Sequence, residues 1–122
     1  MNKVVVYDHP LILHKLGIMR DKTTCHKQFK ELLQEISFLM AYELTRDIKY
    51  STREIETPLE KMNAVHVEGN KITIIPVLRA GLGMSDAISS LIPTAKTGHL
   101  GMKRDEKTLQ PYIYYNHIPK DI

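Results

Sequence analysis

Two arginines in this sequence stand where an arginine is well placed to bind an anion. Arg79 closes an apolar run and is followed by three small residues, Ala80, Gly81 and Gly83. Amide groups at the start of a helix attract anions, and glycines let a ligand approach the backbone. A guanidinium adds a rigid fork of donors that suits phosphate. The segment therefore predicts an anion site made by Arg79 and the amides of Ala80, Gly81 and Gly83.

A purely structural interpretation of the same residues stays open. Arg79 would then be a surface cation, and the glycines would only make a turn, since the pattern is neither a Walker A motif nor a complete GxGxxG. Arg104 has a comparable place, just past the next predicted strand. If the two strands are neighbours, Arg79 and Arg104 converge on one polyphosphate. The alternative for Arg104 is a solvated, charged turn.

Hydrophobic spacing indicates the elements that position these residues. Apolar residues recur at three- and four-residue intervals after Pro10 and again across 29–44, which predicts two helices. Further along, we expect an extended segment at 53–57, strands at 64–67, 72–77 and 94–102, and a helix at 83–91.

The run at 72–77 is apolar on both faces, as in a parallel strand covered by helices. Strand, helix and strand from 72 to 102 then form one βαβ unit. The predicted fold is α/β, a single domain over 1–122 with a helical region at 1–50. Sheet, helix and a hairpin arm follow at 51–122. The arm, 108–119, carries three tyrosines and either clasps a second subunit or folds back on its own domain.

Composition excludes several classes of protein. The chain has 122 residues, 43% of them hydrophobic and 25% charged, which is typical of a globular domain. The net charge of +3 is spread along the chain without a basic patch, so no nucleic-acid partner is predicted. No apolar run approaches the ~18 residues that cross a bilayer, so no membrane partner is predicted either. The single cysteine, Cys25, fits a reducing cytoplasm.

Other catalytic chemistries find little support. The six histidines lack the spacing of metal ligands, and no serine lies in a nucleophile elbow. The acidic pairs at 54/56 and 105/106 fall outside predicted apolar pockets. We therefore predict no catalytic acid, base or nucleophile and no protein metal site.

Four stretches taken together resemble the N-terminal part of bacterial uracil phosphoribosyltransferases: "VYDHPLILHKLGIMRDK", "PVLRAGLGM", "GHLGMKRDEKT" and "YIYYNHIP". The resemblance implies a type I phosphoribosyltransferase fold. It also implies the reaction of uracil with 5-phosphoribosyl 1-diphosphate (PRPP) to give UMP and pyrophosphate, usually with Mg²⁺. The family's PRPP-contacting arginines correspond to Arg79 and Arg104. A homodimer or higher homo-oligomer through the 108–119 arm is implied as well.

The sequence departs from the family pattern in two respects. The PRPP loop, an acidic pair before a Thr-Gly-Gly-Ser type turn, and the uracil-recognition segment have no counterpart within these residues. Met102 and Lys103 also stand where an aromatic residue often precedes the family's Arg-Asp. We expect the chain to be inactive alone. The alternative is a non-catalytic oligomerising or anion-binding domain derived from that family.

Overall fold

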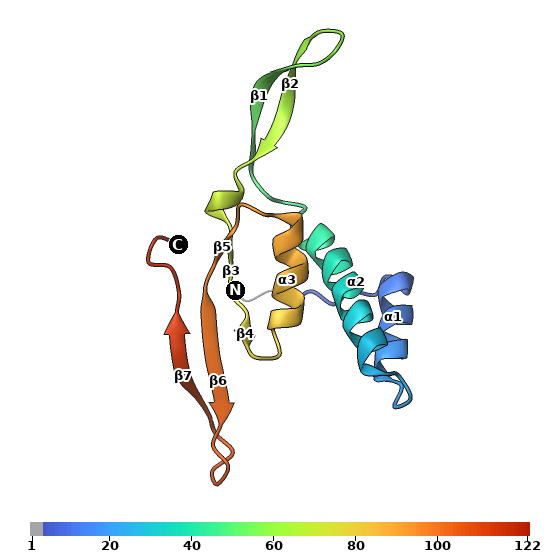
Figure 1. Ribbon diagram of the computed structural model, residues 1–122, viewed down its shortest axis with the longest axis vertical. Coiled ribbons are helices and arrows are strands. Elements are labelled where there is room, and N and C mark those ends of the chain that lie inside the picture. Colours follow the sequence, from blue (N-terminus) through green and yellow to red (C-terminus); the bar gives the residue numbers. More distant parts are fainter. Residues whose placement is uncertain (1–3) are drawn as a thin grey trace.

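The computed structural model describes residues 4–122, which fold into three α-helices and seven strands (Figure 1). In chain order the elements are α1 (Pro10–Arg20), α2 (His26–Leu44), β1 (Tyr50–Glu56), β2 (Lys61–Val67), a 3₁₀ turn (Gly69–Lys71), β3 (Thr73–Ile74), β4 (Val77–Leu78), α3 (Leu82–Leu91), β5 (Lys96–Thr97), β6 (His99–Arg104) and β7 (Pro111–His117). Among these residues no helix is long and apolar enough to cross a membrane.

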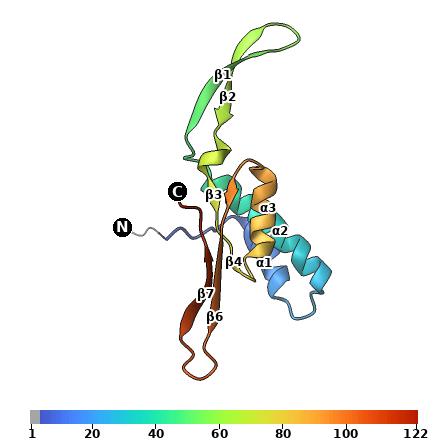
Figure 2. The same ribbon diagram turned by 60° about the vertical axis from the view of Figure 1, so that its left-hand side comes forward.

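The core lies among the three helices. α2 packs against α1 on one side and α3 on the other (Figures 1 and 2). Within residues 4–122, these helices contribute the buried side chains of Ile12, Leu32, Ile36, Ala41 and Ala87, and Pro76 is buried beside β4. The predicted N-terminal helices are therefore confirmed. Ile12, Leu32 and Ile36 of their apolar stripes are buried, whereas Leu11, Phe29 and Leu44 are exposed.

One parallel ladder organises the sheet. The amides of Lys96, Gly98 and Leu100 donate to the carbonyls of Ile72, Ile74 and Pro76 at 2.8, 3.0 and 3.1 Å. β3 thus pairs with β5 and β4 with β6, both in parallel, and α3 is the crossover between them. The predicted βαβ unit is confirmed.

The predicted strand over 72–77 is present as two short strands, β3 and β4. Pro76 lies between them, and a proline has no amide to donate to a ladder. Its carbonyl still accepts, so the pairing with the next strand continues past the interruption. Pro76 therefore divides the predicted strand in two, while its parallel direction and its partner segment are those expected from the sequence.

Two hairpins complete the molecule. β7, which holds most of the predicted 108–119 arm, pairs antiparallel with β6 as the third strand of a sheet ordered β4-β6-β7. β1 and β2 pair antiparallel from Tyr50↔Val67 to Glu56↔Lys61 and project from the body as a two-stranded ribbon (Figures 1 and 2). The sequence predicted an extended segment at 53–57 and a strand at 64–67, but not their pairing.

Asp105 organises the tight connection between β6 and β7. Its carboxylate accepts the amides of Thr108 and Lys107 at 2.8 and 2.9 Å, and its carbonyl accepts the amide of Leu109. These hydrogen bonds to the ionised form hold the pKa of the Asp105 carboxyl below its ordinary value of 3.8. The turn that follows Arg104 is thus tied to an ionised aspartate.

We expect Ile36→Ala to lower the free energy of unfolding by about 2–4 kcal/mol, because it empties a packed position in α2. The side chain of Ile36 is 6% exposed, whereas that of Ile55 on the β1–β2 ribbon is 43% exposed. Ile55→Ala, the same truncation at an exposed site, should cost about 1 kcal/mol or less. Urea unfolding followed by circular dichroism measures both, and equal losses would contradict this placement of the core.

The Asp105 turn should weaken in acid. A carboxyl with a lowered folded pKa stabilises the fold above its unfolded pKa, and this contribution is lost as pH falls through the folded value. The amide resonances of Lys107 and Thr108 should therefore shift with a midpoint below pH 3.8. Asp105→Asn should abolish that transition. A midpoint at or above the ordinary aspartate value would show that the carboxylate does not hold the turn.

Candidate functional site

The carboxyl ends of β4 and β6 lie side by side and carry the two arginines. In the parallel pair, Val77 is opposite Leu100 and Leu78 is opposite Gly101. Arg79 follows Leu78 directly, and Arg104 is the last residue of β6. At 3.3 Å per residue, Arg104 stands about 7 Å beyond the level of Arg79 along the strands. A long guanidinium side chain at each position can reach the space between them.

A tight turn joins β4 to α3 and contains Arg79. The peptide bond between Leu78 and Arg79 is cis. The amide of Gly81 donates to the carbonyl of Val77 at 2.8 Å. A Cβ on Gly81 would lie 2.8 Å from the backbone nitrogen and oxygen of Val77, so a side chain there would force the turn open. Gly81 therefore lets the chain reverse directly after the strand, which keeps Arg79 at its end.

The first turn of α3 leaves amides available beside this arginine. The amide of Leu82 donates to the carbonyl of Arg79 at 3.2 Å, and Gly81 is already engaged. Within residues 4–122, no backbone carbonyl accepts the amides of Gly83 or Met84. Unsatisfied amides and the helix dipole both favour an anion at such a position. Met84, whose amide joins that of Gly83, was not expected from the sequence.

Gly83 also has a packing role. A Cβ at Gly83 would lie 2.7 Å from Cδ2 of Leu33, so the absent side chain allows α3 to approach α2 closely. The glycine thus fixes α3 against the helical core at the same turn whose amides face the strand ends. The sequence analysis expected the glycines to let a ligand approach the backbone. In the structure the group beside Gly83 is Leu33 of α2.

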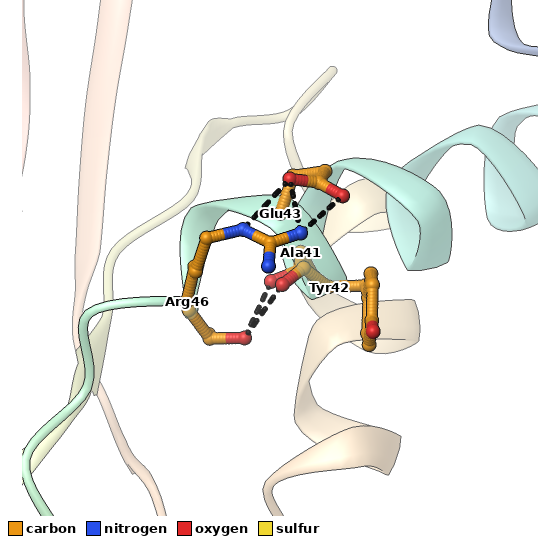
Figure 3. Close-up of polar contacts among 5 residues, drawn as sticks. Ala41, Tyr42, Glu43 and Arg46 are labelled. Atoms are coloured by element: carbon orange, nitrogen blue, oxygen red, sulfur yellow. Dashed lines mark hydrogen bonds and ion pairs between the residues drawn. The ribbon is translucent and has the colours of Figure 1, made fainter. Parts of the chain in front are cut away.

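Both arginines are exposed, and neither pairs with a carboxylate among the described residues. Arg46 shows the contrasting case (Figure 3). Its guanidinium binds both oxygens of Glu43 at 2.9 Å, and the hydrogen bonds and charge of Glu43 raise the pKa of Arg46. Because Glu43 balances the charge of Arg46, that residue attracts an anionic ligand only weakly. No carboxylate among the described residues balances the charges of Arg79 and Arg104 in this way.

Two other kinds of site find less support in the fold. No cluster of three or more His, Cys, Asp or Glu side chains that could hold a metal ion occurs within residues 4–122. An apolar cavity of about 450 Å³ lies at the other end of α3, where Leu91 to Thr94 meet the C-terminal part of α2 and the base of the β1–β2 ribbon. Neither arginine lines it. The strand ends therefore remain the candidate site.

The comparisons with known proteins agree with one another. The family model described as "Uracil phosphoribosyltransferase" matches residues 5–122. Proteins named uracil phosphoribosyltransferase from Clostridium botulinum (strain Eklund 17B / Type B) and Clostridioides difficile (strain 630) are each 56% identical to this chain over 122 residues. One from Finegoldia magna is 52% identical over the same length. Each alignment covers 100% of this chain and 58% of the relative.

A solved structure gives the same result for the fold. The structure titled "Structure of AQ2163 protein from Aquifex aeolicus" superposes with a TM-score of 0.88 at 34% sequence identity, covering 96% of this chain and 56% of that one. This supports the partial phosphoribosyltransferase-like α/β fold that the sequence predicted. Since the family model and the relatives cover the helices, the sheet and both arginines, the chain belongs to the uracil phosphoribosyltransferase family.

Proposed function

We propose that these residues form the diphosphate-binding part of a uracil phosphoribosyltransferase. The protein would transfer the 5-phosphoribosyl group of PRPP to uracil, giving UMP and pyrophosphate in pyrimidine salvage. The parallel pairing of β4 with β6 carries the proposal, because it brings Arg79 and Arg104 to one edge of the sheet beside the first turn of α3. The chain spans 58% of the length of the relatives it matches, so the complete reaction is proposed for the whole enzyme, to which these residues contribute one part of the site.

The chemistry assigned to the site is electrostatic. As the bond from the ribose to the diphosphate breaks, negative charge accumulates on the leaving pyrophosphate. Donors already aimed at that position stabilise the charge without reorganising. Arg79 and Arg104 would contact the diphosphate, with the amides of Gly83 and Met84 adding partial positive charge. The amide of Ala80 belongs to the same proposal, whereas that of Gly81 serves the turn.

Magnesium is expected from the family, and the described residues do not supply a cluster for it. Mg²⁺ keeps several waters and commonly binds through substrate phosphates with one or two carboxylates. In this proposal any magnesium accompanies PRPP, and no step of the chemistry assigned to these residues passes through it. A location in the cytoplasm is proposed as well, supported by the single cysteine.

We also propose that the protein forms a homodimer or a higher homo-oligomer. The predicted 108–119 arm contributes exposed Tyr112, Ile113 and Tyr114 on β7, and the β1–β2 ribbon adds exposed Met62 and Val65. A two-stranded ribbon has little stability by itself in water, so a partner surface would stabilise it. Sedimentation velocity over a hundredfold range of concentration should show association, and a monomer throughout would remove this proposal.

Removing either arginine should weaken diphosphate binding. We expect Arg79→Ala and Arg104→Ala each to raise the Kd for PRPP and for pyrophosphate about ten-fold, the effect of one lost charge-assisted hydrogen bond. Isothermal titration with the 122-residue chain, with and without Mg²⁺, measures this. Arg20→Ala is the matched control, since Arg20 is an exposed arginine at the end of α1. An equal loss in the control, or no binding by the unaltered chain, would contradict the site.

A further inference from the structure

The pairing of β6 with β7 is irregular shortly before the end of β6 that carries Arg104. Gly101 is opposite Tyr115, but the next residue, Met102, is opposite Ile113. Tyr114 is therefore the extra residue of a β-bulge. Bulges increase the local twist of a strand and change the direction in which its side chains point. The bulge lies directly before the last residues of β6.

The Tyr114 ring fills the space beside Gly101. A Cβ on Gly101 would lie 2.7 Å from Cζ of Tyr114 and 2.8 Å from its Cε2. Gly101 is buried although it lies in a strand whose later residues are all exposed. The absent side chain therefore makes room for the aromatic ring, which rests against the backbone of β6.

The same ring contacts a charged side chain further along β6. The ammonium of Lys103 lies 5.0 Å from the centroid of the Tyr114 ring, within the range of a cation–π interaction. Gly101 and Lys103 are two residues apart, so they lie on the same face of the strand. Tyr114 thus contacts β6 at two successive positions on one face, and Met102 and Arg104 belong to the other face.

We propose that Tyr114 is a positioning residue for Arg104. The ring rests on Gly101 and attracts Lys103 on one face of β6. In this way it fixes the conformation of the last residues of the strand and so the direction of Arg104 on the other face. Fewer rotatable bonds of the Arg104 side chain then lose their freedom when a diphosphate binds. Preorganisation of this kind increases affinity. The proposal rests on the diphosphate site above and adds to it the contact of Tyr114 with Lys103.

The test combines pyrophosphate titration of the full chain with a measurement that needs no ligand. Tyr114→Leu keeps apolar bulk over Gly101 but removes the π face. We expect it to raise the Kd for pyrophosphate roughly two- to five-fold, the loss of one exposed cation–π contact. Tyr114→Phe should restore the unaltered Kd. In the free protein, the heteronuclear ¹H–¹⁵N NOE of the Arg104 Nε should fall in Tyr114→Leu and not in Tyr114→Phe.

A double-mutant cycle with Lys103→Met separates the contact from simple charge removal. If Lys103 acts through Tyr114, its substitution should matter less in the Tyr114→Leu background. Tyr42→Leu is the control, because it removes another tyrosine–cation contact, in which Arg46 lies 6.0 Å from the Tyr42 ring on α2. It should leave both measurements unchanged.

The outcomes separate this proposal from the one it rests on. Additive effects of Lys103→Met and Tyr114→Leu, or an unchanged Arg104 NOE in Tyr114→Leu, overturn the positioning role while the diphosphate site stands. An equal effect of Tyr42→Leu overturns it too, because a general loss of stability would then explain the weaker binding. An unaltered chain that does not bind pyrophosphate overturns both proposals.

Discussion

The structure depends on a continuous parallel ladder between residues 72–78 and 96–101. Three amides of the second strand donate to alternate carbonyls of the first, at 2.8 to 3.1 Å. Parallel strands need a crossover between them, and α3 supplies it by packing on α2. Because the strands run in the same direction, both carboxyl ends reach one edge of the sheet. A slip of one residue would reverse the faces of the strand and separate Arg104 from Arg79.

Two glycines maintain this arrangement, because each lets another part of the chain lie close to the backbone. Gly81 allows the turn after β4 to fold back onto Val77, and Gly101 admits the ring of Tyr114 against β6. The close approach at Gly81 fixes the position of Arg79 after β4. The one at Gly101 lies near Arg104 at the end of β6. The proposed anion site would therefore be a consequence of strand pairing and backbone proximity. Its two arginines have no carboxylate partners among residues 4–122.

The sequence predicted the parts whose signals are local. The apolar spacing in α2 reflects a helix that buries one face, and the β-branched run before Arg79 reflects a strand covered on both faces. The helices and the βαβ unit were therefore predictable. The pairing of β1 with β2 was not, because nearly all residues of the ribbon are exposed and no buried face imposes an alternation. Pro76 interrupted a strand whose direction was predicted correctly.

The candidate site divides in the same way. Arg79 and Arg104 follow predicted strands, so their place at strand ends could be predicted. The engagement of the Gly81 amide and the contact of Tyr114 with Gly101 depend on turn geometry and on a bulge between distant residues. A glycine inside a strand pattern was the one available signal for the second contact. It indicates that some group approaches the backbone, without saying which.

Backbone resonances mapped during a pyrophosphate titration test the central claim most directly. If the ladder delivers both strand ends to one diphosphate, the amides of residues 79–84 and 102–104 should shift together, with one common Kd. Shifts confined to one of the two segments, or spread over the β1–β2 ribbon and α1 instead, would contradict a shared site at the edge of the sheet.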